Sequence, residues 1–362
     1  MHIETAELRR AFDSVRHVAD SSTALTALAG GQVRLHTPEG GRLVLTARDD
    51  HLEATDALPC DGEALDVCLP ASRIASVLVT AGDAISIEHT GPKALVKSGR
   101  SRHTIACLPG EKMASIALEG EPRTRISAPD MGKIIASVIW AAAKGRLDIP
   151  ALNGIHLCAD AEHVTATATD AGMLATHCCD VKAQSGPEQS FDAVISLVAA
   201  QRIVALTPEH VEVRAGTLRF LAANNRALTV RTLAFTYPDW KKLFPQAEGG
   251  IKVNREEFLS AVTAAASYDE IKGKDKSMRA VMLKSDGARL VVYSPGRNEG
   301  CRYEIETIGC QVEASYRANC LVRALNEVEA DEIELLFATR DGHTYLRIND
   351  GEWRFLLAPY TI

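Results

Sequence analysis

Two pairs of histidine and cysteine residues have the types and the spacing of metal ligands. His156 and Cys158, and likewise His177 and Cys179, are two residues apart, so within a β-strand the side chains of each pair point to one face. Zinc is commonly bound by imidazole and thiolate. We expect a further strand at 163–169 to lie between the pairs and to separate them by two strand spacings, about 9.5 Å. Zinc–ligand bonds are only about 2.0–2.3 Å long, so the sequence predicts buried thiols and histidines and no metal site.

Motifs for enzymatic chemistry are missing. The stretch KGKDKS at 272–277 resembles a phosphate loop superficially but lacks the G-x-x-x-x-G-K-[ST] spacing. G-x-S-x-G, H-E-x-x-H and G-x-G-x-x-G do not occur. The adjacent Cys178 and Cys179 could form a redox site, although a strand setting favours inert packing. We therefore expect no enzymatic activity and no cofactor.

The composition is that of an ordinary globular protein. At 362 residues the chain is long enough for two or three domains, and 46% hydrophobic with 24% charged residues excludes a disordered or fibrous protein. The net charge of −7 does not exclude nucleic acid as a partner, because a basic surface can occur on an acidic protein when charges are segregated. Nine cysteines without a toxin-like spacing, and no signal peptide or long apolar stretch, favour a cytoplasmic location.

One segment is unusually aromatic. LAFTYPDWKKLFP at 233–245, called the linker segment below, holds four of the chain's 18 aromatic residues. They are Phe235, Tyr237, Trp240 and Phe244. Its two prolines make a long regular element unfavourable there. Such a loop either fills an interdomain core or belongs to an interaction surface.

A pattern of four element types recurs three times along the chain. A short strand followed by an amphipathic helix begins at Ile3, Ile126 and Val253. A second strand begins at Arg42, His163 and Arg289. A helix with an alternating strand then covers 72–88, 198–214 and 319–336, and a hairpin closes each unit at 94–108, 217–233 and 344–358.

Four element types in the same order predict three α+β domains, each with two helices and a mostly antiparallel sheet. We place them at 1–120, 121–244 and 245–362, with the linker segment at the second join. The alternative is one large domain with accidental periodicity.

The motifs resemble those of the bacterial sliding clamp, the beta subunit of DNA polymerase III, over the full length of the chain. The similar pieces are LVKSGRSRHTIACLP (95–109), LNG (152–154), ATDAGMLA (168–175), YPDWKKLFP (237–245) and FLLAPYTI (355–362). The resemblance implies a head-to-tail homodimer, closed into a six-domain ring around duplex DNA with its helices facing the hole. Such a protein catalyses nothing and tethers the DNA polymerase III alpha subunit, the clamp loader and other proteins with clamp-binding motifs.

By this resemblance, basic side chains would contact DNA. A ring that slides must bind phosphates and leave base edges alone, and clustered basic residues in loops suit that role. The loop candidates are Lys144, Arg146, Lys272, Lys274, Lys276 and Arg279, and the helix candidates are Arg9, Arg10, Arg73, Lys133, Arg202 and Arg323. Surface helices normally carry such residues, so a purely structural role is the alternative for each. The first repeat has SSTALT at 21–26, where the family often has arginine, which predicts a weaker grip on DNA by the first domain.

The resemblance also implies an outward-facing cleft that takes short apolar peptides from partner proteins. The residues at the corresponding positions are Leu152, Thr169, Ala171, Gly172, Met173, Leu174, Pro238, Lys242, Leu243, Leu356, Ala358, Pro359 and Tyr360. Gly172 and Met173 stand where the family has His-Arg, and Tyr360 replaces an adaptable methionine. We therefore expect weaker or altered affinity for the usual clamp-binding peptides.

Ring closure would pair an edge strand of the first domain with the third domain of the partner chain, which satisfies backbone groups on both edges. The corresponding residues are Arg100, Arg102, His103, Ile105, Tyr268, Glu299 and Glu304. The family commonly has an aromatic residue where His103 stands, so closure is expected to be weaker because a smaller polar ring buries less apolar surface. Two rival functions remain: a clamp paralogue with a private partner, and a scaffold or inhibitor that forms no ring.

Overall fold

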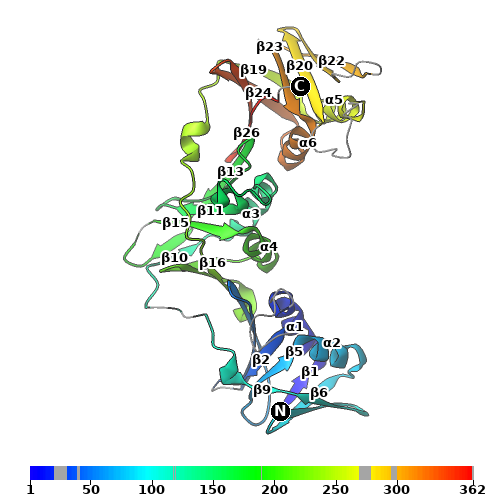
Figure 1. Cartoon of the computed structure of the whole chain (residues 1–362), viewed down its shortest axis with the longest axis vertical. Coiled ribbons are helices and arrows are strands. Elements are labelled where there is room, and N and C mark those ends of the chain that lie inside the picture. The colour runs from blue at the N-terminus through cyan, green and yellow to red at the C-terminus, as the bar shows by residue number, and fades with distance from the viewer. Residues whose placement is uncertain are drawn as a thin grey trace. The chain divides into compact units, whose positions relative to one another are not determined.

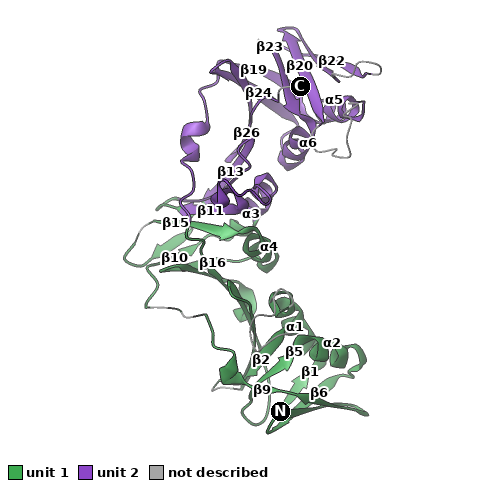
Figure 2. Cartoon of the chain, viewed as in Figure 1, with its two compact units in different colours: residues 1–132, 159–162, 180–234 green, residues 133–158, 163–179, 235–362 purple. Residues whose placement is uncertain are grey.

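The computed structural model describes residues 1–19, 31–38, 41–116, 118, 120–188, 190–268, 279–294 and 300–360. It divides into two compact units (Figure 2). Unit 1 comprises residues 1–132, 159–162 and 180–234, and unit 2 comprises 133–158, 163–179 and 235–362. The division passes through the second predicted domain, so the three domain boundaries stay a prediction.

Six α-helices lie in the described ranges, in the order that the repeats predict (Figure 1). They are α1 (Thr5–Ala19), α2 (Ala71–Thr80), α3 (Met131–Val138), α4 (Leu197–Leu206), α5 (Arg255–Ser267) and α6 (Ala318–Glu327). Each is preceded by a strand and buries an apolar stripe, as Leu8, Phe12 and Val15 do in α1. Two of the starts are capped by a side chain: the Ser196 hydroxyl accepts the N–H of Ala199 at α4, and the Asn254 side chain accepts the N–H of Glu257 at α5.

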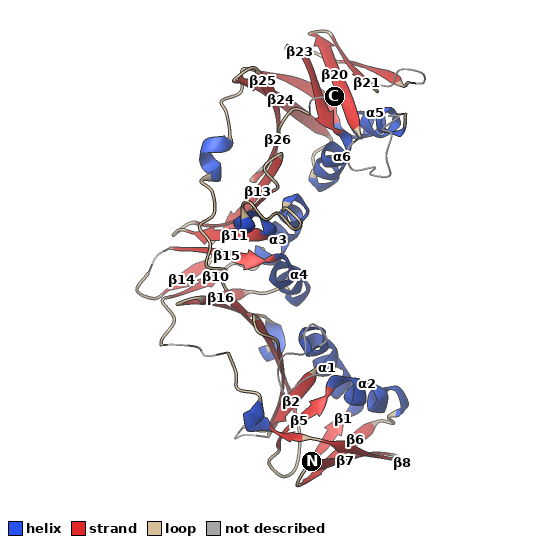
Figure 3. Ribbon diagram, viewed as in Figure 1, coloured by secondary structure: helices blue, strands red, loops and turns tan. Residues whose placement is uncertain are grey.

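Unit 1 contains two antiparallel sheets (Figure 3), and α1 packs against β3 and β4. The strands are β1 (His2–Glu4), β2 (Gln32–His36), β3 (Arg42–Arg48), β4 (Leu52–Pro59), β5 (Asp66–Pro70), β6 (Ala84–Thr90), β7 (Lys93–Ser98), β8 (Ser101–Ala106), β9 (Leu108–Pro109), β10 (Thr124–Ser127), β14 (Ala183–Ser185), β15 (Phe191–Ser196), β16 (His210–Arg214), β17 (Thr217–Leu221) and β18 (Ala227–Arg231). One sheet has the order β1-β6-β7-β8, and the other β14-β10-β16-β17-β18-β4-β3-β2-β5-β9. The longer sheet continues from the first predicted domain into the second through the pairing of β4 with β18.

Unit 2 is likewise built from antiparallel sheets and helices, and its helices α5 and α6 pack on each other. Its strands are β11 (Gly154–Ala159), β12 (His163–Thr169), β13 (Met173–Asp180), β19 (Gly249–Asn254), β20 (Ala280–Asp286), β21 (Arg289–Tyr293), β22 (Arg302–Glu306), β23 (Gln311–Arg317), β24 (Glu332–Arg340), β25 (His343–Asp350) and β26 (Trp353–Leu357). They follow the orders β11-β12-β13-β26-β25-β24-β19 and β22-β21-β20-β23. Here β13 and β26 pair across the second predicted join. The expected hairpin at NDG is present, with Gly351 at a φ of 55°.

The expected strand between the two His–Cys pairs is also present, because β12 lies between β11 and β13. Among the residues that the structure describes, no group of three His, Cys, Asp or Glu side chains is placed to hold a metal ion. Burial and a hydrogen bond to Glu352 raise the pKa of the Cys178 thiol to about 12, so at neutral pH this thiol is protonated and a poor nucleophile.

No helix within the described ranges is both long and apolar enough to cross a membrane.

Candidate partner-binding site

The pairing of β13 with β26 brings two of the predicted cleft segments side by side in unit 2. Met173 lies opposite Leu357, and Leu174 lies opposite Leu356. Beyond β26 the pairing continues, because the N–H of Ala358 donates to the carbonyl of Gly172 at 2.9 Å. The tail of the chain therefore lies directly beside the turn between β12 and β13.

Asp170 shapes that turn. Its Oδ1 accepts the N–H groups of Gly172 and Met173, both at 2.8 Å, an Asx-type turn that asparagine or aspartate supports. The hydroxyl of Thr169 donates to the carbonyl of Met173 at 2.6 Å. Ala171 has a φ of 72°, which is unfavourable for a residue with a Cβ. The side chain of Asp170 thus compensates for backbone strain at its neighbour.

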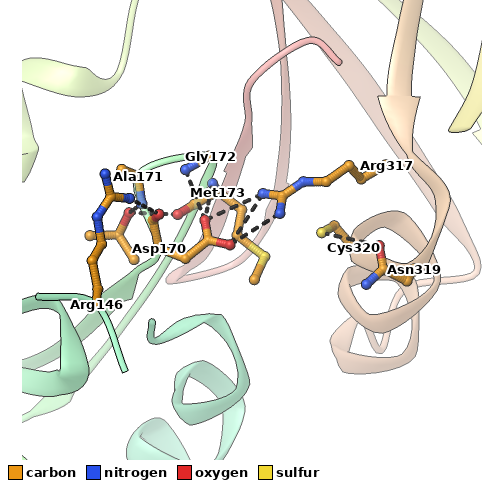
Figure 4. A network of polar contacts seen from close by, with 9 residues as sticks. Arg146, Asp170, Ala171, Gly172, Met173, Arg317, Asn319 and Cys320 are labelled. Atoms are coloured by element: carbon orange, nitrogen blue, oxygen red, sulfur yellow. Dashed lines mark hydrogen bonds and ion pairs between the residues drawn. The ribbon is translucent and has the colours of Figure 1, made fainter. Parts of the chain in front are cut away.

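Arg317, at the end of β23, reaches the same carboxylate (Figure 4). Its Nη1 lies 3.2 Å from Oδ2, and its Nη2 lies 3.3 Å from Oδ1 and 3.2 Å from Oδ2. Gly172 makes room for this ion pair, since a Cβ at that position would lie 2.4 Å from Nη2 of Arg317. The glycine that stands where the family has histidine is therefore matched to Arg317.

Arg146 approaches the turn from the other side (Figure 4). Its Nη1 donates to the backbone carbonyl of Asp170 at 2.7 Å, and its Nε and Nη2 bind Asp148. Its backbone N–H donates to the side chain of Asn153 at 2.8 Å. The side chain predicted to contact DNA is thus engaged within unit 2, where it supports the candidate peptide site.

The C-terminal segment 358–360, called the tail, is also hydrogen-bonded to Ser315. The N–H of Tyr360 donates to the carbonyl of Ser315 at 2.8 Å, and the Ser315 hydroxyl donates to the carbonyl of Tyr360. Residues 358–360 are half-buried. The tail is therefore an ordered wall that joins the turn to β23.

The aromatic side chains of the linker segment pack on unit 2. The Tyr237 ring stacks on His156, with centroids 4.9 Å apart, and the Trp240 indole N–H donates to Nδ1 of His156 at 3.3 Å. Phe244 meets Trp240 edge-on and lies under the guanidinium of Arg347. The linker segment is thus partly core, yet Phe235 and Leu243 remain 47% and 43% exposed.

The predicted cleft residues fall into three groups by burial. Leu152, Thr169, Leu174 and Leu356 are buried, Gly172, Met173, Pro238, Ala358, Pro359 and Tyr360 are half-buried, and Ala171, Lys242 and Leu243 are exposed. Lys242 forms an ion pair with Asp239 at 2.7 Å. The buried residues support the surface of the candidate site, and the half-buried and exposed residues form that surface. Asp170, Arg317 and Ser315 escaped the sequence prediction, although Asp170 is part of the quoted ATDAGMLA motif.

The predicted DNA-contacting side chains differ in availability. Arg9, Arg73, Lys133, Lys144 and Arg323 are exposed, and Lys133 forms an ion pair with Glu329, which is exposed as well. Arg10 instead binds the fully buried Asp56 at 2.9 Å and also Glu7. Arg202 lines a cavity of about 220 Å³ beside Asp13 and His17, and Arg279 donates to the carbonyl of Ala266. Lys272, Lys274 and Lys276 lie outside the described residues.

Four of the predicted interface residues lie on strands that end their sheets in the described part of the chain. Arg102, His103 and Ile105 are on β8, at one end of its sheet, and Glu304 is on β22, at one end of another. Ile105 is buried within the chain, whereas Arg100, Arg102 and Glu304 are exposed. Tyr268, just after α5, is 45% exposed. Glu299 lies outside the described residues.

Comparison with known proteins gives one consistent result. No family model matches the chain. The chain is 21% identical over 336 residues to the beta sliding clamp of Vibrio cholerae, covering 89% of each chain, and 21% identical over 310 residues to that of Haemophilus influenzae.

Solved structures agree at full coverage. The DNA polymerase III subunit beta of Pseudomonas aeruginosa matches with a TM-score of 0.87 at 19% identity over 100% of both chains. The DNA polymerase sliding clamp of Bacillus subtilis matches with 0.87 at 18% identity, over 100% of this chain and 98% of that one. The chain therefore has the fold of the bacterial sliding clamps, and the resemblance predicted from its sequence motifs is confirmed.

Proposed function

We propose that this protein is a DNA sliding clamp, a processivity factor that encircles duplex DNA as a homodimeric ring and tethers the replicative DNA polymerase. The observation that carries the proposal is the match over the whole chain to a DNA polymerase III beta subunit, with a TM-score of 0.87. A clamp needs all of its modules to span the circle, so full coverage is more informative than a match to one module.

Electrostatics support DNA as a partner despite the net charge of −7. Arg73 and Arg323 are exposed on α2 and α6, and Lys144 is exposed just beyond α3. Exposed cations on helices and loops bind phosphates without reading sequence. Arg10 and Arg146, whose charges are matched within the chain, contribute less to this surface than the sequence predicted.

Ring closure is supported by two exposed strand edges of opposite charge. Arg102 on β8 and Glu304 on β22 are exposed on edge strands of separate sheets, although Arg289 and Arg302 of the same chain already pair with Glu304. Pairing β8 of one protomer with β22 of its partner would satisfy both edges and place unlike charges together. The exposed Arg100 lies at the same end as Arg102 and would add to the attraction.

The site around Asp170 and the linker segment would bind a short apolar segment of partner proteins, among them the polymerase alpha subunit, the clamp loader and other proteins with clamp-binding motifs. Exposed apolar side chains beside a rigid turn suit a peptide that brings its own apolar anchors. We infer a non-catalytic role in the cytoplasm, which agrees with the sequence motifs.

The solution mass tests this proposal. Light scattering behind size-exclusion chromatography should give about twice 39.0 kDa across a dilution series. Replacing Glu304 with Arg should shift the mass toward the monomer, and combining it with Arg102→Glu should restore the dimer. A mass near 39.0 kDa at every concentration would reject the ring and favour a scaffold that keeps the fold without encircling DNA.

A further inference from the structure

The ion pair between Asp170 and Arg317 is long for its type. Its three contacts measure 3.2 Å, 3.2 Å and 3.3 Å, whereas charge-assisted N–H···O bonds are shortest and strongest at about 2.7–2.9 Å. The two guanidinium nitrogens also meet the carboxylate unevenly, because Nη2 contacts both oxygens while Nη1 contacts one. Arg317 is therefore held near the site without an optimal partner.

Asp170 can stabilise the turn without its ion pair to Arg317. Its Oδ1 accepts two backbone N–H groups at 2.8 Å, and its side chain is 21% exposed. If the guanidinium moved away, the carboxylate would keep those two bonds and gain water. The turn would consequently persist without the ion pair.

Arg317 is placed where a ligand of the proposed peptide site would meet it. Its side chain is 23% exposed, and it passes over Gly172 in the space that a Cβ would occupy (Figure 4). Gly172 is the residue whose carbonyl fixes the tail at Ala358, and Met173 follows it with an apolar, half-buried side chain. A cation thus lies among apolar elements of one small surface.

Guanidinium chemistry points to the ligand. Arginine presents a planar fork of donors that matches a carboxylate in a bidentate arrangement, and part of its desolvation cost is already incurred by its burial. An incoming carboxylate with free geometry can approach at a shorter distance than Asp170, whose position is fixed by the turn. A neutral side chain offers no such gain.

We propose that Arg317 is the specificity-determining residue of the partner-peptide site and binds an aspartate or glutamate side chain of the incoming apolar segment, exchanging Asp170 for it. The inference rests on the proposed function, since it assumes that peptides bind at this site. It adds one requirement: the partner segment carries a carboxylate next to its apolar anchors.

Fluorescence anisotropy with paired synthetic peptides tests the exchange. The probes are labelled nonapeptides with leucine and phenylalanine anchors, in which each remaining position in turn is glutamate or glutamine. At one position the glutamate peptide should bind wild-type protein about tenfold more tightly, equivalent to about 1.4 kcal/mol. Arg317→Met should erase the difference, and Arg340→Met, which removes an exposed arginine from β24, should preserve it.

Asp170→Asn separates ligand recognition from a structural role. The asparagine oxygen still accepts the two N–H bonds of the turn, but without a negative charge it competes far less for Arg317, so the glutamate peptide should bind several-fold more tightly while the glutamine peptide is unchanged. A weaker glutamate complex in this variant would assign Arg317 to structure alone and overturn the inference.

The outcomes also separate the two proposals. Equal binding of both peptides to wild-type protein at every position would overturn the inference and leave the peptide site standing. Failure of every peptide to bind would reject the site itself, and the inference with it. If Arg317→Met did not fold, Asp170→Asn would still decide.

Discussion

At each of the two predicted domain joins, one β-sheet continues across the join through an antiparallel strand pair. The side chains that hold the linking segment differ between the two joins. At the first join β4 pairs with β18, and at the second β13 pairs with β26, both antiparallel. The chain that links the domains is fastened by charged and polar groups at the first join. It is fastened by aromatic rings at the second.

At the first join, the segment that precedes the second predicted domain buries its large apolar side chains. Met113 and Ile116 are buried, and the N–H of Ile116 donates to Glu53 at 2.7 Å. The polar cavity beneath, about 270 Å³, is lined by Arg34, Glu53 and Arg219 among others. The apolar side chains there are already used by the fold.

At the second join, some apolar side chains of the linker segment are not buried by the fold. Tyr237 is buried against His156, yet Phe235 and Leu243 of the same linker segment stay exposed. The two joins therefore share an antiparallel strand pairing and differ in exposed apolar surface, and we propose that the exposed side chains of the second join serve the partner-binding site.

Tyr237→Ala should have the largest effect. Removing this buried ring from its stack should cost about 4 kcal/mol of unfolding free energy and weaken peptide binding, because the linker segment loses its anchor. Denaturant unfolding and anisotropy would measure both, with Tyr237→Phe as the control that keeps the ring. Unchanged stability would refute the anchoring role.

Ile116→Ala is the matched change at the first join. Truncating this buried side chain should cost about 3 kcal/mol while peptide affinity stays as in the wild type. Loss of peptide affinity in this variant would contradict the division of labour between the joins.

Ala171→Gly should have a smaller effect of opposite sign. Ala171 is at a φ of 72°, and glycine removes the Cβ penalty of the left-handed region, so the variant should gain about 1 kcal/mol, less the entropy that glycine adds to the unfolded chain. A scan of melting temperature would show the gain. A clear loss would mean that the Cβ of Ala171 makes contacts that outweigh the strain.

Glu53 should make a smaller contribution to stability, and that contribution should depend on pH. Burial raises the pKa of this carboxyl, although the N–H of Ile116 opposes the shift. A raised pKa means that folding favours the protonated form, so the stabilisation is complete below the pKa of an unfolded glutamate and is lost as pH rises through the folded value. The melting temperature of the wild type relative to that of Glu53→Gln should therefore rise as the pH falls from neutral toward the pKa of an unfolded glutamate; a constant difference would show that the pKa of Glu53 is not raised by folding.

The sequence predicted the fold well because the information was local. Apolar periodicity around Leu8, Phe12 and Val15 specifies a helix, and its recurrence twice more specifies the order of elements. The pairing of Asp170 with Arg317, which joins residues 147 positions apart, has no local signature. Basic residues on helices were equally ambiguous, since nothing near Arg10 in sequence shows that it is matched to the buried Asp56.

Encirclement of DNA is the central claim, and linear DNA with free or blocked ends tests it without a clamp loader. A closed ring threads onto free ends, so retention on a linear duplex should vanish when both ends carry streptavidin, and a covalently closed circle of the same sequence should retain no protein. Equal retention on the free-ended, end-blocked and circular DNAs would show ordinary surface binding and contradict the account.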